Sequence, residues 1–187
     1  DERVKFVITH CGVFQDDSTP KYFLKALSAF ITKNPSAKSR IEARFVGTMQ
    51  PNHAKLINKY GLDGVAHSTG YVPHNEAIQE LCESDALWLM ATNAERLPGK
   101  LFEYIGAQKP LLVCAPEGSI RKTAMDTKAA VTTAPTDVKA IESAIATLYE
   151  AWSKGELPTP NPKYAGMFDT KILTADLSRE LAISARM

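Results

Sequence analysis

Short apolar runs alternate along the chain with longer segments in which apolar residues recur every three or four positions. A strand that is buried on both faces reads as a continuous apolar run, whereas an amphipathic helix shows the longer period. Ala86–Met90 (ALWLM) is the clearest such strand, and the segment that follows Pro20 is the clearest helix. This alternation predicts a doubly wound parallel sheet of about six strands with helices on both faces.

The expected strands are short, and segments of helical period separate them. We predict strands at Val4–His10, Ile41–Val46, Val65–Thr69, Ala86–Met90, Leu111–Ala115 and Ala129–Thr133. We predict helices after Pro20 and at Ala54–Tyr60, Asn75–Glu83, Gly99–Gly106 and Ala134–Lys154. The proline-rich stretch Leu157–Pro162 then breaks the pattern. The prediction is therefore one domain over residues 1–155, followed by a linker and a C-terminal helical tail over residues 156–187.

Composition excludes several classes of protein. Apolar residues make up 44% of the chain and charged residues 23%, and the net charge of +1 provides no basic surface for nucleic acid. Cys11, Cys82 and Cys114 form no CxxC pair or Cys/His cluster, which argues against a metal site and for a reducing, cytoplasmic compartment. No apolar run approaches the roughly 20 residues of a transmembrane segment. The start DERVKFVIT shows no signal peptide and enters a strand at once, which favours a fragment of a longer protein.

The loop after Ala86–Met90 carries the most informative chemistry, because parallel α/β sheets bind ligands at the carboxyl ends of their strands. Pro98-Gly99 stands where the next helix should begin, so the amides of Gly99, Lys100 and Leu101 are expected to be free first-turn donors. Lys100 adds a positive charge to such an anion site. Glu103 follows about one helical turn later, where a carboxylate can accept hydrogen bonds from ribose. These residues indicate a site for a nucleotide diphosphate.

The same residues also have an ordinary interpretation. Lys100 and Glu103 are equally well explained as a solvated pair on a helix, and the dinucleotide-binding fingerprint GxGxxG is absent. His10 ends the first strand and is expected to be structural, and no histidine belongs to a Ser/His/Asp constellation. Local spacing alone leaves both interpretations open.

A resemblance to a known family favours the nucleotide. The segment Glu95–Glu103 (ERLPGKLFE) has two glutamates separated by seven residues and is followed by YIGAQKPLLV. It resembles the E-x7-E signature of retaining group 1 (family 4) glycosyltransferases. GYVPHNEAI from Gly70 and the start VKFVITHCGVF are similar to other segments of that family in the same order, over most of residues 3–150. The resemblance implies a Rossmann-like fold, as in the C-terminal, nucleotide-sugar-binding domain of the two-domain GT-B architecture.

The resemblance also implies roles for the residues around the predicted helix at Gly99–Gly106. Glu103 would hold the ribose hydroxyls, and Glu95, the candidate catalytic residue, would face the hydroxyls of the donor sugar. The amides of Gly99, Lys100 and Leu101, together with the Lys100 side chain, would bind the diphosphate.

Two further loops would complete the site. Gly12 and Val13 would approach the phosphates, and Tyr71, Val72 and Pro73 would border the base, mainly through backbone groups of Val72. The substrate would be a UDP- or GDP-linked sugar. No metal and no cofactor is expected, because helix amides and basic side chains neutralise the leaving diphosphate.

The acceptor is expected to bind elsewhere. The resemblance implies that an N-terminal domain missing from this chain holds an acceptor glycan, lipid-linked or other, and that the tail Tyr164–Leu181 packs on that domain. The isolated chain would then be inactive. The full-length protein would be cytoplasmic, with peripheral membrane attachment through the absent half left open.

The first loop departs from the family pattern. Val13 replaces a usual arginine, and Asp16 and Asp17 make the loop acidic, which weakens the expected phosphate contact from this side. Two alternatives stay open: half of a sugar-nucleotide 2-epimerase, which shares the architecture, and a non-enzymatic interaction module on a flavodoxin-like sheet.

Overall fold

The computed structural model describes residues 5–15, 17–94 and 96–184, and a sheet of six parallel strands forms its centre. In chain order the strands are β1 (Phe6–Cys11), β2 (Ile41–Val46), β3 (Ala66–Gly70), β4 (Ala86–Met90), β5 (Leu111–Cys114) and β6 (Ala130–Thr133). Their order across the sheet is β3-β2-β1-β4-β5-β6, so the direction of winding reverses between β1 and β4. The predicted doubly wound α/β fold is confirmed.

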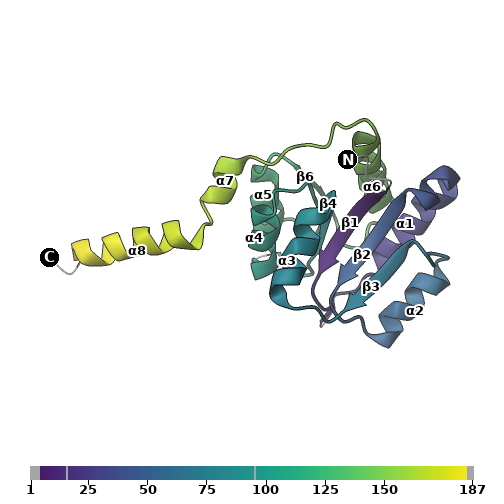
Figure 1. Cartoon of the computed structure of the whole chain (residues 1–187), viewed down its shortest axis with the longest axis horizontal. Helices are drawn as coiled ribbons and strands as arrows, with labels where there is room; N and C mark the ends of the chain where they lie inside the picture. The colour runs from purple at the N-terminus through teal and green to yellow at the C-terminus, as the bar shows by residue number, and fades with distance from the viewer. Residues whose placement is uncertain (1–4, 16, 95, 185–187) are drawn as a thin grey trace.

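Helices cover both faces of the sheet (Figure 1). On one face lie α1 (Lys21–Lys33), α2 (Pro51–Lys59) and α6 (Val138–Ser153), and on the other lie α3 (His74–Glu83), α4 (Gly99–Gly106) and α5 (Ser119–Asp126). A short 3-10 helix, η1 (Pro35–Ser39), precedes β2. The strands therefore bury side chains on both faces, which explains why β4 and β5 are wholly buried and apolar.

Trp88 of β4 lies at the centre of the larger core. Its ring stacks on Phe23 of α1, with 4.1 Å between the ring centroids, and meets Phe45 of β2 edge-on at 6.0 Å. Its indole nitrogen donates a hydrogen bond to the Cys114 sulfur at 3.2 Å. Aromatic contacts of this kind add to the free energy of apolar burial. They hold β4 against α1 and so help to position the loop that follows β4.

Some elements differ from the sequence prediction. The prediction misses α5, because its sequence SIRKTAMD buries only Ile120 and Ala124 and shows little helical period. The helix predicted at Ala134–Lys154 is α6, which begins at Val138 rather than Ala134. The Asp137 carboxylate caps it by accepting a hydrogen bond from the Ala140 amide at 3.0 Å. Val4, the predicted start of the first strand, lies outside the described residues.

The C-terminal tail forms two helices, α7 (Pro162–Gly166) and α8 (Thr170–Ser184). The helix α7 packs on α4. Just after α7, the Phe168 ring contacts Phe102 of α4, with 4.9 Å between the ring centroids. Beyond it, α8 extends away from the domain (Figure 1), and Leu173, Leu177 and Leu181 are exposed. Within the described ranges, no helix has the length and apolar character needed to cross a membrane.

Candidate functional site

The strand order of the sheet reverses between β1 and β4, which makes this position its switch point. β1 pairs with β2 along its whole length, whereas its pairing with β4 ends at Thr9 and Leu87. The carboxyl ends of β1 and β4 are therefore not joined by strand pairing. In open α/β sheets such a switch point is the usual position of the ligand. The loops after β1 and β4 flank it here, and α4 begins at the end of the second loop.

Gly12 and Lys100 lie next to each other at this switch point. Gly12 follows β1 and has a φ of +115°, a conformation that favours glycine. A Cβ atom at this position would lie 2.8 Å from Nζ of Lys100, so the lysine side chain uses the space that the glycine leaves. In the described part of the chain, no carboxylate lies within ion-pair distance of Lys100. Lys100 is thus a half-buried cation that lies against the first loop and has no ion-pair partner among the described residues.

Electrostatic effects link this lysine to Cys11 and Glu103. Burial lowers the pKa of Lys100, and the neighbouring Cys11 and Glu103 oppose that shift. The pKa of the Cys11 thiol is raised by burial and then by Glu103, while Lys100 acts in the opposite direction. The carboxyl end of β1 and the first turns of α4 therefore share one electrostatic environment, as a binding site between them requires.

The start of α4 lies where the sequence predicts it, at Gly99. Pro98 is the N-cap residue and has no side-chain acceptor for the first amides. The amide of Leu101 donates to the Pro98 carbonyl at 3.0 Å, and the Leu101 side chain is fully buried. The prediction that the Leu101 amide is free is therefore wrong, because the turn itself supplies its acceptor, and the amides of Gly99 and Lys100 remain the predicted donors to a ligand. Glu103 follows on the next turn and is exposed.

A cavity of about 300 Å³ adjoins the first loop. Gly12, Val13, Tyr71 and Val72, four of the predicted site residues, line this cavity. The rest of its lining comes from Cys11, Val46, Gly47, Thr48, His74 and Ala77. Pro73 is the N-cap residue of α3, directly after Val72. Two loops that are distant in the sequence thus share one cavity.

The mouth of this cavity carries exposed apolar side chains. Tyr71 is 84% exposed and Val13 is 42% exposed. Ligand pockets commonly combine apolar walls with a few polar groups that orient the ligand. An aromatic ring and a valine beside the backbone of the first loop therefore suit a planar ring with polar edges, such as a nucleobase.

His10 is a core residue and not part of the charged site. Its side chain is 2% exposed, Nδ1 lies 3.0 Å from the Trp88 carbonyl, and the ring stacks on Phe14 with 4.5 Å between the centroids. Burial and, to a smaller extent, the nearby Lys100 lower the pKa of His10 to about 3, although the hydrogen bond to Trp88 opposes the shift. The ring is therefore neutral at physiological pH and cannot neutralise a phosphate.

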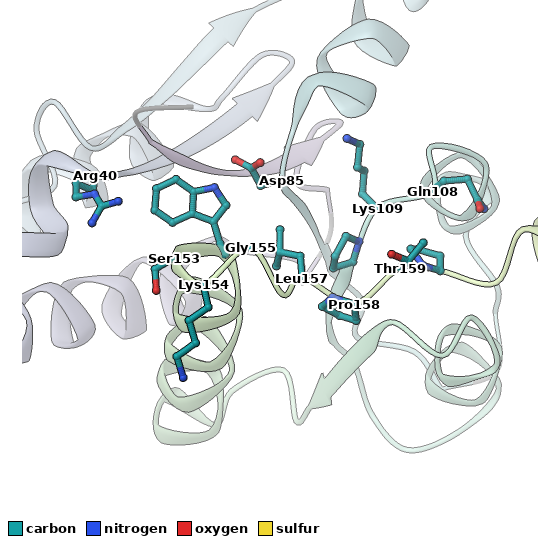
Figure 2. A pocket seen from close by; sticks show the side chains of 13 residues that line it. Arg40, Asp85, Gln108, Lys109, Ser153, Lys154, Gly155, Leu157, Pro158 and Thr159 are labelled. Carbon is teal, nitrogen blue, oxygen red and sulfur yellow. The ribbon is translucent and has the colours of Figure 1, made fainter. Parts of the chain in front are cut away.

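A larger cavity of about 1020 Å³ lies at the opposite edge of the sheet, near the residues that precede β4 and β5 (Figure 2). Three of its charged side chains already have partners in the fold. The Asp85 carboxylate accepts a hydrogen bond from the Val7 amide at 2.8 Å, and the Lys154 ammonium pairs with Glu150 at 2.6 Å. Arg40 stacks over the Trp152 ring at 5.1 Å. Because α/β sheets bind ligands at the carboxyl ends of strands, we assign the site to the smaller cavity.

Two positions singled out in the sequence, Glu95 and Asp16, lie outside the described residues. Asp17 is exposed in the first loop. Among the residues that the structure describes, no three His, Cys, Asp or Glu side chains gather closely enough to hold a metal ion.

Sequence reasoning missed the residues that join the loops to one another. The hydroxyl oxygen of Tyr104, a fully buried residue, accepts a hydrogen bond from the Cys11 amide at 2.6 Å. Gly47 lies against the first loop, where a Cβ atom would be 3.5 Å from the Gly12 carbonyl. The only signals for these roles are the position of Tyr104 beside Glu103 and the position of Gly47 directly after a strand.

Comparison with known protein families gives one clear result. Residues 5–151 match the family described as group 1 glycosyl transferases. A search of curated proteins found no match.

Solved structures share the fold at low sequence identity. HepE from Anabaena, solved in complex with UDP, is 16% identical with a TM-score of 0.73, and the alignment covers 96% of this chain and 49% of HepE. The pneumococcal O-GlcNAc transferase GtfA is 14% identical with a TM-score of 0.71, over 96% of this chain and 36% of GtfA. The catalytic domain of cholesterol-alpha-glucosyltransferase from Helicobacter pylori is 18% identical with a TM-score of 0.60, over 91% of this chain and 98% of that domain.

This chain therefore spans about half the length of HepE and less of GtfA. Its fold is that of these enzymes, and the family match covers most of its residues. The chain belongs to the group 1 glycosyl transferases.

Proposed function

We propose that this chain is the donor-binding half of a glycosyltransferase that transfers a sugar from a nucleotide diphosphate to an acceptor hydroxyl. The observation that carries the proposal is the ammonium group of Lys100, which lies beside Gly12 at the switch point of the sheet and has no ion-pair partner among the described residues. A diphosphate between the first loop and α4 would supply the missing negative charge. Helix amides and a cation in a partly buried site are well suited to such an anion.

The similar structures favour UDP as the nucleotide. HepE has been solved with UDP-glucose, and GtfA with UDP and GlcNAc. In the proposed complex the uracil ring occupies the cavity of about 300 Å³ beside Tyr71 and Val72, with Pro73 following them, and Gly12 and Val13 approach the phosphates from the first loop. Backbone groups of Val72 would make most of the base contacts, so the side chains do not identify the base. A GDP-linked donor is therefore the alternative, and titration with both nucleotides compares the two.

In the proposed reaction, negative charge develops on the diphosphate as its bond to the sugar breaks. The Lys100 ammonium and the amides of Gly99 and Lys100 would stabilise that charge without a metal, with Leu101 closing the turn behind them. Glu103 would accept hydrogen bonds from the ribose hydroxyls. Glu95 would face the hydroxyls of the donor sugar and is the candidate catalytic residue. This role, the retaining mechanism and membership of family 4 rest on the resemblance of Glu95–Glu103 to the E-x7-E signature.

The tail supports a proposal about the rest of the enzyme. Leu173, Leu177 and Leu181 are 50%, 60% and 61% exposed, and their spacing of four residues places them on one side of α8. We propose that residues 1–155 form the donor domain and that residues 156–187 pack on it or on an N-terminal domain that holds the acceptor glycan. The isolated chain would then bind the donor weakly and transfer no sugar. A cytoplasmic location belongs to the same proposal.

Calorimetric titration with UDP and with GDP tests the donor site. Glu103→Ala should lower the affinity for the nucleotide about tenfold or more, because each lost hydrogen bond to a charged group is worth about 1.5–3 kcal/mol. Glu156→Ala is the matched control, because this glutamate is exposed in the linker after α6. Binding of one nucleotide that Glu103→Ala weakens and Glu156→Ala preserves supports the site. Failure of the unmodified chain to bind either nucleotide would refute it.

A further inference from the structure

Tyr104 bridges the two segments that form the proposed diphosphate site. It lies on α4, directly after Glu103, and its side chain is fully buried. Its hydroxyl oxygen accepts a hydrogen bond from the backbone amide of Cys11, with 2.6 Å between the two atoms. These residues are 93 positions apart in the chain. A single phenol therefore connects the end of β1 with α4.

The sheet explains why the Cys11 amide needs this partner. The next amide, that of Gly12, donates to the Val46 carbonyl of β2 at 2.8 Å. Successive amides of a strand point to opposite sides, so the Cys11 amide is directed towards β4. The pairing of β1 with β4 ends at Thr9 and Leu87, before it reaches Cys11. The Tyr104 hydroxyl thus takes the place of a strand carbonyl where the two strands part.

The position of Tyr104 on α4 relates this hydrogen bond to Lys100. The two residues are four positions apart, so they lie on the same side of the helix, one turn from each other. Tyr104 contacts Cys11, and Lys100 reaches Gly12, the next residue of the first loop. Burial raises the pKa of the Tyr104 phenol, which keeps it in the neutral form. The first loop and α4 therefore meet at two points, Cys11 with Tyr104 and Gly12 with Lys100.

We propose that Tyr104 is a positioning residue for the nucleotide diphosphate: its hydrogen bond to Cys11 sets the spacing between Gly12 and Lys100 at which the phosphates bind. This inference rests on the proposed function. It assigns no contact between Tyr104 and the substrate. The phenol acts through the first loop and through the helix turn that carries Lys100.

The decisive experiment compares ligands with and without phosphates. UDP and uridine are titrated into the unmodified chain, into Tyr104→Phe and into Tyr149→Phe, a control tyrosine of α6 that packs on Phe6 and Phe30. We expect Tyr104→Phe to lower the affinity for UDP about tenfold while changing that for uridine less than about twofold. Tyr149→Phe should change neither affinity. A variant that only loosened the domain would weaken both ligands alike.

Equal losses for UDP and uridine, or no loss for either, would overturn the positioning role while leaving the nucleotide site intact. An unmodified chain that binds no UDP would overturn the proposed function and this inference together. Hydrogen exchange of the Cys11 amide in the unmodified chain provides a test without a variant. Slow exchange supports a persistent bond to Tyr104, and exchange as fast as that of exposed loop amides refutes it.

Discussion

The ammonium group of Lys100 occupies the space that a side chain at Gly12 would fill, since a Cβ atom there would lie 2.8 Å from Nζ. One residue belongs to the loop after β1 and the other to the first turn of α4, on the two sides of the switch point. The lack of a side chain at Gly12 therefore leaves room for the Lys100 ammonium group, which has no ion-pair partner among the described residues.

Gly12→Ala is expected to displace Lys100 and to lower the affinity for UDP about tenfold. Gly64→Ala is the matched control, because Gly64 also has a positive φ, +75°, but a Cβ atom there would meet nothing within 4 Å. Both variants should lose about 1–3 kcal/mol of folding free energy through backbone strain. Titration calorimetry and urea unfolding separate the two effects. Equal UDP affinities of the two variants would contradict the role of Gly12.

Lys100→Met is expected to weaken UDP binding about tenfold or more while leaving the midpoint of thermal unfolding unchanged or slightly raised. The substitution removes a half-buried charge that has no described ion-pair partner, and desolvation of such a charge opposes folding. Lys122→Met, at an exposed lysine of α5, should change neither property. A clear loss of thermal stability in Lys100→Met would mean that the lysine serves the fold rather than a ligand.

His10 should make folding stability depend on pH. Its pKa is about 3 in the folded chain and 6.5 as the ordinary value, so between these pH values the unfolded chain binds a proton that the folded chain does not. Stability is therefore full above pH 6.5 and is lost as pH falls, by at most about 1.4 kcal/mol per pH unit from this group.

Urea unfolding at pH 7 and pH 5 measures this effect. His10→Gln should show a smaller difference between the two pH values than the unmodified chain, and His74→Gln, at an exposed histidine, should retain the full difference. An unchanged pH dependence in His10→Gln would show that the buried imidazole is not its source.

Removal of α8 should leave the domain intact. A chain that ends at Asp169 loses Leu173, Leu177 and Leu181, which are exposed, so its free energy of unfolding should change by less than about 0.5 kcal/mol. Phe168→Ala should instead lower that free energy by about 2 kcal/mol, because the Phe168 ring packs on Phe102 and Tyr164. Denaturant titration of both variants is the measurement. A large loss on truncation would place α8 in the folding unit of this chain.

Local patterns in the sequence are enough to predict most strands and helices of the fold and the start of α4. Continuous apolar runs such as Ala86–Met90 mark strands because both faces of the sheet are covered, and Pro98-Gly99 marks the start of α4 because a helix begins there without internal acceptors for its first amides. These signals are local, so they can be read within a few residues. The helix α5 escaped prediction because it buries only Ile120 and Ala124.

The contacts between distant segments could not be predicted from the sequence and became visible in the folded structure. The contact of Lys100 with Gly12, the hydrogen bond from the Cys11 amide to Tyr104, and the cavity shared by Val13 and Tyr71 all join segments that are distant in the chain. They depend on where the pairing of β1 with β4 stops and on how α4 lies against the gap. No local period carries that information, because it arises from the packing of the whole sheet.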